Sequence, residues 1–409
     1  MSAGESALIR PLWRNRDFLL LWWGQAASAL GSTMAALVYP LLALLAGGSA
    51  TAAGLVGLAG VGAGAIVRLP SGVLADRWPR KRIMICSDAI RALVVGSVAT
   101  ALIFDGLTLP HLVLAAVLTG VCDVLFDSAQ AVAVRHVVPV EQLPRAVAQN
   151  EARAHVAGLV GQPLGGLLYG FGVVVPVLVD AFSYLLSGVL NLLIRNPLSD
   201  PPTAAPRRAW RHDLAVGMRY VWSQPYLQAS MLAAAGFQLV FTGLTLAIIA
   251  SAKIQGSAAV HIGMAFALGG IGGIGGAWAA GRVQARFAPS TLVYGFGWTA
   301  ALCVAAMGWV ANPYVLGALL ALVYFAATPA NAMLMALQIH VTPPELHGRV
   351  LSAAMFIASC AAPLGPPLAG VLLDRVGITP AFLALAVLTG AITVAMHLSP
   401  AIRTMRRPS

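Results

Sequence analysis

The chain has 409 residues, of which 59% are hydrophobic and only 10% are charged. A soluble domain is about one quarter charged, so this composition excludes an ordinary soluble enzyme and places most of the surface against lipid. The net charge of +11 would favour nucleic-acid binding on a soluble protein, but membrane topology explains the positions of the basic residues better.

Twelve apolar segments are each long enough to cross a bilayer as a helix, which takes roughly 20 residues. In chain order they cover residues 18–46, 51–75, 83–104, 109–134, 145–170, 173–195, 225–252, 256–281, 290–310, 313–338, 349–373 and 377–399. Gly is frequent within them, as expected where helices pack closely in lipid. The pattern predicts an all-α membrane protein with about twelve transmembrane helices.

The longest polar stretch, residues 196–213, follows the sixth segment and is rich in Pro. It predicts a division into an N-terminal six-helix half (1–195), a cytoplasmic linker (196–224) and a C-terminal six-helix half (225–409). Within the linker, the residues from Trp210 to Trp222 have an amphipathic pattern and are expected to lie on the membrane surface.

The basic residues concentrate on one side of the predicted bundle. With a cytoplasmic N-terminus, most of the 25 Lys and Arg residues fall in cytoplasmic segments, and the outer loops hold only Lys253 and Arg375. Cytoplasmic loops of membrane proteins carry such an excess. We therefore expect a multi-pass protein of the plasma or inner membrane, with both termini cytoplasmic and with lipid rather than nucleic acid around it.

The two halves repeat each other at a fixed offset. The matched pairs are His136 and His340, Pro139 and Pro343, Glu141 and Glu345, Arg145 and Arg349, Gly161 and Gly365, Pro163 and Pro367, and Gly166 and Gly370. The matches begin in the loop before the fifth helix of each half and continue into that helix. Duplicated halves of this kind are a transporter architecture with the substrate site between the halves near mid-membrane.

The loop after the second segment reads GVLADRWPRKR over residues 72–82. It resembles the signature that the major facilitator superfamily carries in the same loop, apart from Pro79, where a Gly is usual. The resemblance implies that fold and a cytoplasmic gate made by Gly72, Asp76, Arg77, Arg80, Lys81 and Asp127. Asp76 is expected at the N-terminus of span eleven, and Arg80 beside Asp127. A plain positive-inside anchor is the alternative.

Further segments are similar to the drug and macrolide efflux branch of that superfamily, which includes siderophore exporters. They are WRNRDF at 13–18, SDAIR at 87–91, DAFSY at 180–184 and GRV at 348–350. The resemblance covers essentially the whole chain. It implies export of a small molecule driven by proton entry.

Spans five and eleven carry Gly and Pro together and are expected to bend. Span five reads GQPLGG, which resembles the superfamily's antiporter signature with its Pro one place late. The bend residues are Gly161, Pro163, Gly165 and Gly166 in span five, and Gly365, Pro366 and Pro367 in span eleven. Two Pro-kinked packing helices without a coupling role remain the alternative.

Charged residues inside the spans occur only in the N-terminal half: Arg68, Asp88, Arg91, Asp123, Asp127, Glu151, Arg153 and Asp180. Each costs roughly 2.5–3.5 kcal/mol in a bilayer, so a function is expected for them. Asp123 is our first candidate for the proton-carrying acid, with a permanently paired structural acid as the alternative. Glu151, with Arg153, is the second. Asp88 and Arg91 are expected to form a local ion pair.

Aromatic, Met and amide side chains on spans one, four, seven and ten suit a lipophilic substrate with a few polar groups. The candidate cavity residues are Trp22, Gln25, Phe126, Gln130, Phe237, Gln238, Phe241, Asn331 and Met335. Ordinary helix packing is the competing interpretation for any one of them.

The sequence shows no phosphate loop, nucleophile elbow or metal-ligand spacing, and the four cysteines lie in apolar stretches. We therefore expect no enzyme activity, no metal and no cofactor. The predicted function is a monomeric secondary transporter that exports small lipophilic molecules, drugs or natural products, in exchange for protons. The alternatives are an uptake symporter of the same fold and a non-transporting membrane receptor on a transporter scaffold.

Overall fold

The predicted apolar segments fold into long helices. The computed structural model describes residues 12–196, 198 and 210–403, and these residues contain helices and no strands. In the first half the helices are α1 (Arg16–Gly47), α2 (Ala50–Arg77), α3 (Arg80–Ile103), α4 (Leu109–Val137), α5 (Leu143–Phe171) and α6 (Val174–Leu193). The expectation of an all-α membrane protein is confirmed.

The rest of the chain repeats this pattern. After the short helix α7 (Trp210–Ser223) come α8 (Pro225–Ile254), α9 (Ala259–Arg286), α10 (Pro289–Met307), α11 (Pro313–Val341), α12 (His347–Ala361), α13 (Gly365–Val376), α14 (Ile378–Leu398) and α15 (Pro400–Arg403). The side chain of Asn15 caps the start of α1, and that of Ser49 caps the start of α2. Such caps satisfy first-turn N–H groups that have no partner within the helix.

Eleven of the helical stretches are long and apolar enough to cross a membrane. Besides the short helices α7 and α15, the helix outside this set is α5, which spans 29 residues but carries Arg145, Glu151 and Arg153 in its first half. Since α5 packs against α1 and α9, it completes a bundle of twelve spans.

Span eleven is interrupted and span five is not. The turn Ala362–Leu364 separates α12 from α13. Pro363 lies within this turn, and Pro366 lies in the first turn of α13. A Pro removes one backbone hydrogen bond and clashes with the preceding turn, which explains the interruption. In contrast, α5 runs through Pro163 as one helix.

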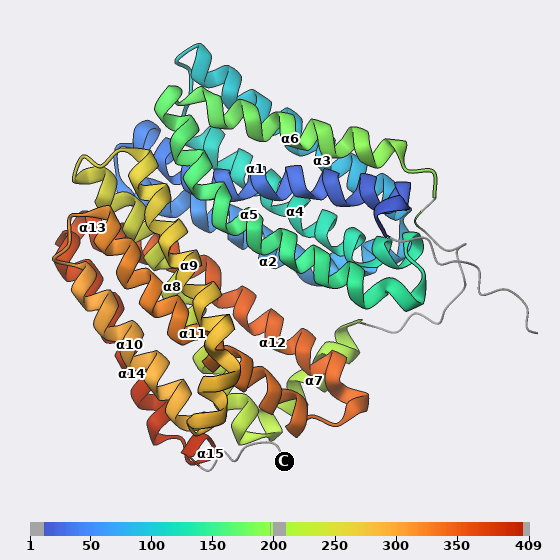
Figure 1. Cartoon of the computed structure of the whole chain (residues 1–409). Coiled ribbons are helices and arrows are strands. Elements are labelled where there is room, and N and C mark those ends of the chain that lie inside the picture. Colours follow the sequence, from blue (N-terminus) through green and yellow to red (C-terminus); the bar gives the residue numbers. More distant parts are fainter. Residues whose placement is uncertain (1–11, 197, 199–209, 404–409) are drawn as a thin grey trace, which may run out of the picture.

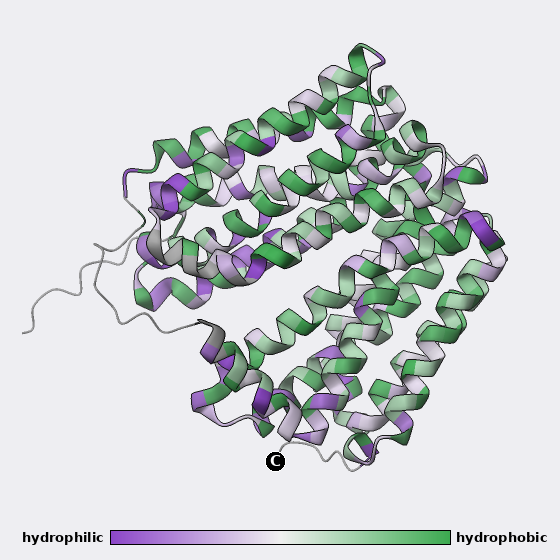
Figure 2. Cartoon of the chain, turned by 180° about the vertical axis from the view of Figure 1, so that it is seen from behind, coloured by the Kyte–Doolittle hydropathy of each residue, from purple (hydrophilic) through white to green (hydrophobic). Residues whose placement is uncertain are grey.

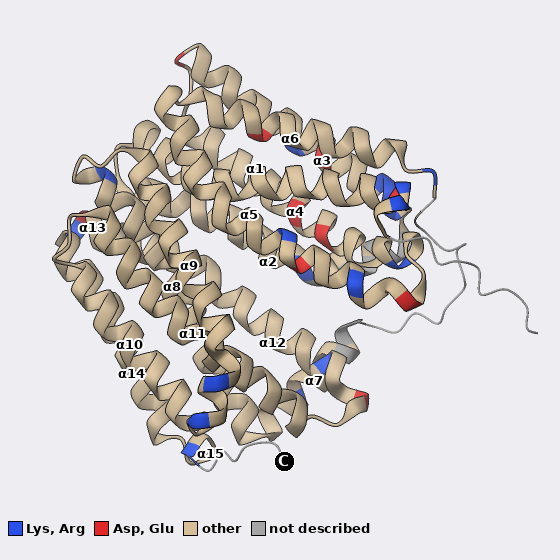
Figure 3. Ribbon diagram, in the orientation of Figure 1, with Lys and Arg blue, Asp and Glu red and all other residues tan. Residues whose placement is uncertain are grey.

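The helices form two layers that meet at one end and diverge toward the other (Figure 1). Helices α1–α6 make one layer and α8–α14 the other. We call the end at which α1 begins and α2 ends the basic end, because Lys and Arg gather there (Figure 3). The opposite end is the far end. Hydrophobic residues cover most of both layers, with hydrophilic ones concentrated toward the helix ends (Figure 2).

The amphipathic segment after the linker, α7, packs against α12. Val221 of α7 is buried with Val350 and Ala353 of α12, and Met218 packs against the same cluster. Part of the apolar face predicted to meet the membrane surface therefore meets protein.

Two glycine contacts, related by the internal repeat, bring the layers together at the far end. A β-carbon on Gly54 of α2 would lie 2.8 Å from the carbonyl oxygen of Pro366 in α13. In the second half, a β-carbon on Gly263, which holds the same place in α9 as Gly54 holds in α2, would lie 2.8 Å from Cα of Pro163 in α5. Only residues without a side chain permit this approach. We call these two contacts the far-end seal.

Candidate functional site

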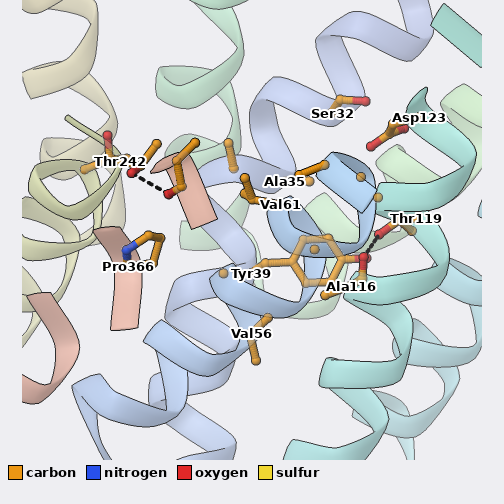
Figure 4. Close-up of a pocket in the computed structure, with 18 of the residues that line it drawn as sticks. Ser32, Ala35, Tyr39, Val56, Val61, Ala116, Thr119, Asp123, Thr242 and Pro366 are labelled. Atoms are coloured by element: carbon orange, nitrogen blue, oxygen red, sulfur yellow. Dashed lines mark hydrogen bonds between the residues drawn. The ribbon is translucent and has the colours of Figure 1, made fainter. Parts of the chain in front are cut away.

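A cavity of about 740 Å³ lies between the two layers. Its wall takes residues from α1, α2, α4 and α6 of the first half and from α8, α12 and α13 of the second (Figure 4). Helix α2 contributes a long stretch from Ala53 to Arg68. The residues lining the cavity include none from span ten (α11), which we had expected to contribute.

The wall is mostly apolar and carries scattered hydroxyl groups. Ser32 and Tyr39 come from α1, Thr119 from α4 and Thr242 from α8. Tyr39 and Thr242 lie on opposite sides of the space (Figure 4). Sites of this composition bind small, largely apolar molecules and orient them through a few polar groups.

Asp123 and Arg68 are the charged residues of the cavity wall. The Oδ1 atom of Asp123 accepts a hydrogen bond from Nη1 of Arg91 at 2.7 Å, while 41% of the Asp123 side chain remains exposed. Asp123 therefore forms an ion pair and still has part of its side chain exposed on the cavity wall.

The expected ion pair between Asp88 and Arg91 is present as well. Arg91 Nη2 donates to Asp88 Oδ1 at 2.5 Å, and both side chains are buried. Asp88 Oδ2 accepts from the Ser187 hydroxyl at 2.8 Å and from the Asn191 amide at 3.1 Å, both on α6. One guanidinium therefore joins two carboxylates, one deep in the half and one on the cavity wall.

The second predicted proton site lies elsewhere. Arg153 of α5 donates to the side-chain oxygen of Gln25 on α1, and Glu151 is exposed on α5. Neither residue is among those that line the cavity.

The predicted gate motif spans the last turns of α2 and the first turn of α3. For Gly72, Asp76 and Arg77 the structure describes the helical backbone only. Lys81 donates to the carbonyl oxygens of Leu192 and Ile194 at the end of α6, at 3.0 and 2.7 Å. A cation is favourable at a helix C-terminus, so Lys81 ties α3 to α6 within one half.

Arg80 has contacts in the same region. Its Nη1 lies 3.3 Å from Nε2 of His136 and 3.4 Å from the carbonyl oxygen of Leu198. The ion pairs of the described residues do not include one between Arg80 and Asp127. The Arg80–Asp127 gate contact stays a prediction for the conformation in which the basic end is closed.

At the far end an acid of one half caps a helix of the other. The two carboxylate oxygens of Asp374, in α13, accept hydrogen bonds from the backbone N–H groups of Ala50 and Thr51 at 3.0 and 2.7 Å. These groups open α2, and an anion is favourable at a helix N-terminus. The repeat places Gly170 at the position that corresponds to Asp374, so only one of the two sides of the seal has this cap.

Replacing Asp374 with Asn should make the far end open more readily. The cap loses its charge and one of its two accepting oxygens, which for an exposed group is worth about 0.7–1.4 kcal/mol, or roughly three- to tenfold in the open population. The readout is labelling of a Ser359→Cys reporter on the cavity wall by an impermeant thiol reagent added at the far end. Native Cys86, Cys122, Cys303 and Cys360 are first replaced.

The matched control is Asp105→Asn, which removes an exposed acid from the far-end loop after α3. Equal labelling of the two variants would show that the cap contributes nothing to closure.

Of the nine residues predicted for the cavity wall, Gln238 lines the cavity. Phe126 and Phe237 are buried in the cores of their own halves, and Gln25 is buried beside Arg153. Phe241 packs on Phe296 and Tyr324. The structure places Trp22 and Gln130 half-buried and Asn331 and Met335 exposed, all four apart from this lining.

Several lining residues were missed by sequence reasoning, among them Tyr39, Tyr184 and Thr242. The signal that could have found the α2 wall is the glycine series Gly57, Gly60 and Gly64, because residues without a side chain leave room beside the helix, and all three line the cavity. In the described part of the chain, His, Cys, Asp and Glu do not gather into a group that could hold a metal ion.

A bundle of membrane-spanning helices in two repeated layers, with a cavity between them that carries a few polar groups, is the architecture of a membrane transporter. The sequence profile of the Major Facilitator Superfamily matches residues 21–359, which is most of the chain. The protein belongs to the Major Facilitator Superfamily.

Individual relatives agree with this assignment. The chain is 26% identical over 384 residues to the multidrug efflux pump Tap of Mycolicibacterium fortuitum, covering 91% of this chain and 93% of that one. It is 27% identical over 408 residues to the multidrug efflux pump Tap of Mycobacterium tuberculosis, covering 96% and 95%.

Solved structures share the fold at low sequence identity. A bacterial homologue of the iron transporter ferroportin in an inward-facing state superposes with a TM-score of 0.74 at 16% identity, over 94% of this chain and 99% of that one. A bacterial homologue of the lysosomal transporter Spinster, inward-facing and occupied, gives 0.72 at 16% identity, over 95% and 96%.

Proposed function

We propose that the protein exports small lipophilic molecules, drugs or natural products, in exchange for protons. The observation that carries the proposal is Asp123, a carboxylate that faces the cavity between the halves and shares a cation with a buried acid. Two relatives that align along nearly the full chain are named multidrug efflux pumps, which supports the direction and the class of cargo.

In the proposed cycle the two layers meet first at the far end and then at the basic end, so that the cavity opens to one side of the membrane at a time. In the conformation described here, the far-end seal and the Asp374 cap hold the far end together, and the substrate enters from the basic end. We place the basic end and both termini in the cytoplasm of the cell, as the positive-inside rule requires. A proton arriving from the far side then replaces Arg91 as the partner of Asp123.

Proton entry supplies enough free energy for this task. One proton crossing a potential of about 150 mV releases roughly 3.5 kcal/mol. Since about 1.4 kcal/mol corresponds to a factor of ten, that supports a gradient of a few hundredfold for an uncharged substrate.

The test is substrate-driven proton flux in proteoliposomes. The purified protein is reconstituted, a panel of lipophilic drugs and siderophores is added on one side, and an internal pH dye is followed. Antiport predicts proton movement opposite to the substrate. Movement in the same direction would identify an uptake symporter, and binding without any flux would identify a receptor on a transporter scaffold.

Orientation has its own test. A green fluorescent protein fused after Ser409 should fluoresce, because it folds to the fluorescent form in the cytoplasm and not after export in unfolded form. A dark fusion, with the same fusion at Asp105 bright, would reverse the assignment of the two ends.

A further inference from the structure

The two carboxylates around Arg91 differ in how firmly they are held. Asp88 is fully buried, and its two oxygens take three donors, from Arg91, Ser187 and Asn191. Asp123 has one bond, through Oδ1, and its side chain is 41% exposed. Asp88 is thus fixed on every side, whereas Asp123 is held on one.

Arg91 also lies against two aromatic rings. The guanidinium carbon lies 4.6 Å from the centre of the Phe126 ring and 4.4 Å from that of Tyr184. Such stacking on aromatic rings is favourable for a guanidinium. Together with the ion pair to Asp88, these contacts hold Arg91 in place, so we expect it to stay with Asp88 if the Asp123 side chain moves.

We propose that Asp88 is a positioning residue that neutralises Arg91, so that Asp123 presents one uncompensated negative charge to the cavity and selects ligands with a single cationic group. The inference rests on the proposed function, since it takes this cavity as the substrate site. Two carboxylates and one guanidinium sum to one negative charge, and the two buried partners neutralise each other first.

Other charged groups stand near the triad without joining it. Asp127 lies one turn further along α4, and Arg68 lies on the cavity wall from α2. Asp180 of α6 is buried, with Oδ1 against Gly31 of α1. Asp180 lies within α6 (Val174–Leu193) and not at either end of that helix. None of the three makes an ion pair among the described residues.

The experiment compares two probes of the same shape and opposite charge, tetraphenylphosphonium and tetraphenylborate. Their equilibrium binding to the purified full-length protein is measured for the wild type, Asp88→Asn, Asp88→Asn/Arg91→Gln and Asp123→Asn, with Asp105→Asn as the matched control. Size-exclusion elution and near-ultraviolet circular dichroism report whether each variant is folded.

The proposal predicts that the wild type prefers the cation. In Asp88→Asn, Arg91 compensates Asp123 instead, and affinity for the cation falls about tenfold although no group on the cavity wall has changed. In the double variant Arg91 is gone as well, Asp123 is again uncompensated, and affinity returns to within about threefold of the wild type.

Three results would overturn the proposal: equal wild-type affinity for the two ions, an undiminished cation preference in folded Asp88→Asn, or no recovery in the folded double variant. The comparison of the two ions on the wild type needs no variant, so it tests the proposal even if every variant misfolds. If Asp123→Asn loses the cation preference and Asp88→Asn keeps it, only the role of Asp88 falls. If Asp123→Asn also transports with unchanged proton coupling, Asp123 loses its coupling role as well. Only the absence of substrate-driven proton flux in the wild type would overturn the proposed function.

Discussion

Replacing Asp123 with Asn is expected to uncouple transport from the proton gradient. An amide keeps the shape of the side chain but does not bind and release a proton near neutral pH. Proton movement driven by substrate should therefore fall by about tenfold or more. The measurement is the same proteoliposome flux, and substrate binding by a neutral compound should survive because the wall is otherwise unchanged.

The control for this variant is Asp105→Asn, which removes an acid of the same size from an exposed loop. Asp123→Glu, which keeps the acid, should retain part of the coupling. Full proton flux in Asp123→Asn would assign Asp123 a structural role, and Glu151 on α5 would then be the next residue to replace.

Adding β-carbons to both contacts of the far-end seal should move the protein toward a state open at the far end. In Gly54→Ala/Gly263→Ala, each new methyl group meets backbone atoms of the other half. Overpacking of this kind costs about 1–3 kcal/mol per site, and the two sites are distant enough to add. Labelling of the Ser359→Cys reporter from the far end should therefore rise by more than tenfold.

The matched control is Gly96→Ala/Gly281→Ala, because a β-carbon at either position meets no atom within 4 Å. Control labelling should equal that of the parent. Unchanged labelling in the seal variant would mean that the two layers separate somewhere else. A seal variant that unfolds without opening would assign the two glycines to the stability of the bundle and not to its cycle.

Much of the charge chemistry was readable from the sequence. Charged residues in a bilayer are costly wherever they occur, so their confinement to the first half singled out Asp123, and the spacing of Asp88 and Arg91 predicted their ion pair. The bond from Arg91 to Asp123 was not predicted, because it joins α3 to α4 and depends on how those helices are rotated against each other.

The sequence by itself determined the helices, the two repeated halves and the membrane setting, since apolar length and the cost of buried charge are properties of each segment alone. Only the tertiary structure decided which residues face the cavity, replacing α11 by α2, α12 and α13, and which acid caps α2. The reason is physical. A helix in lipid is apolar on nearly every side, so it lacks the polar face that orients a helix in water. Its rotation is set by close contacts such as Gly54 on Pro366, which exist only once the two halves have met.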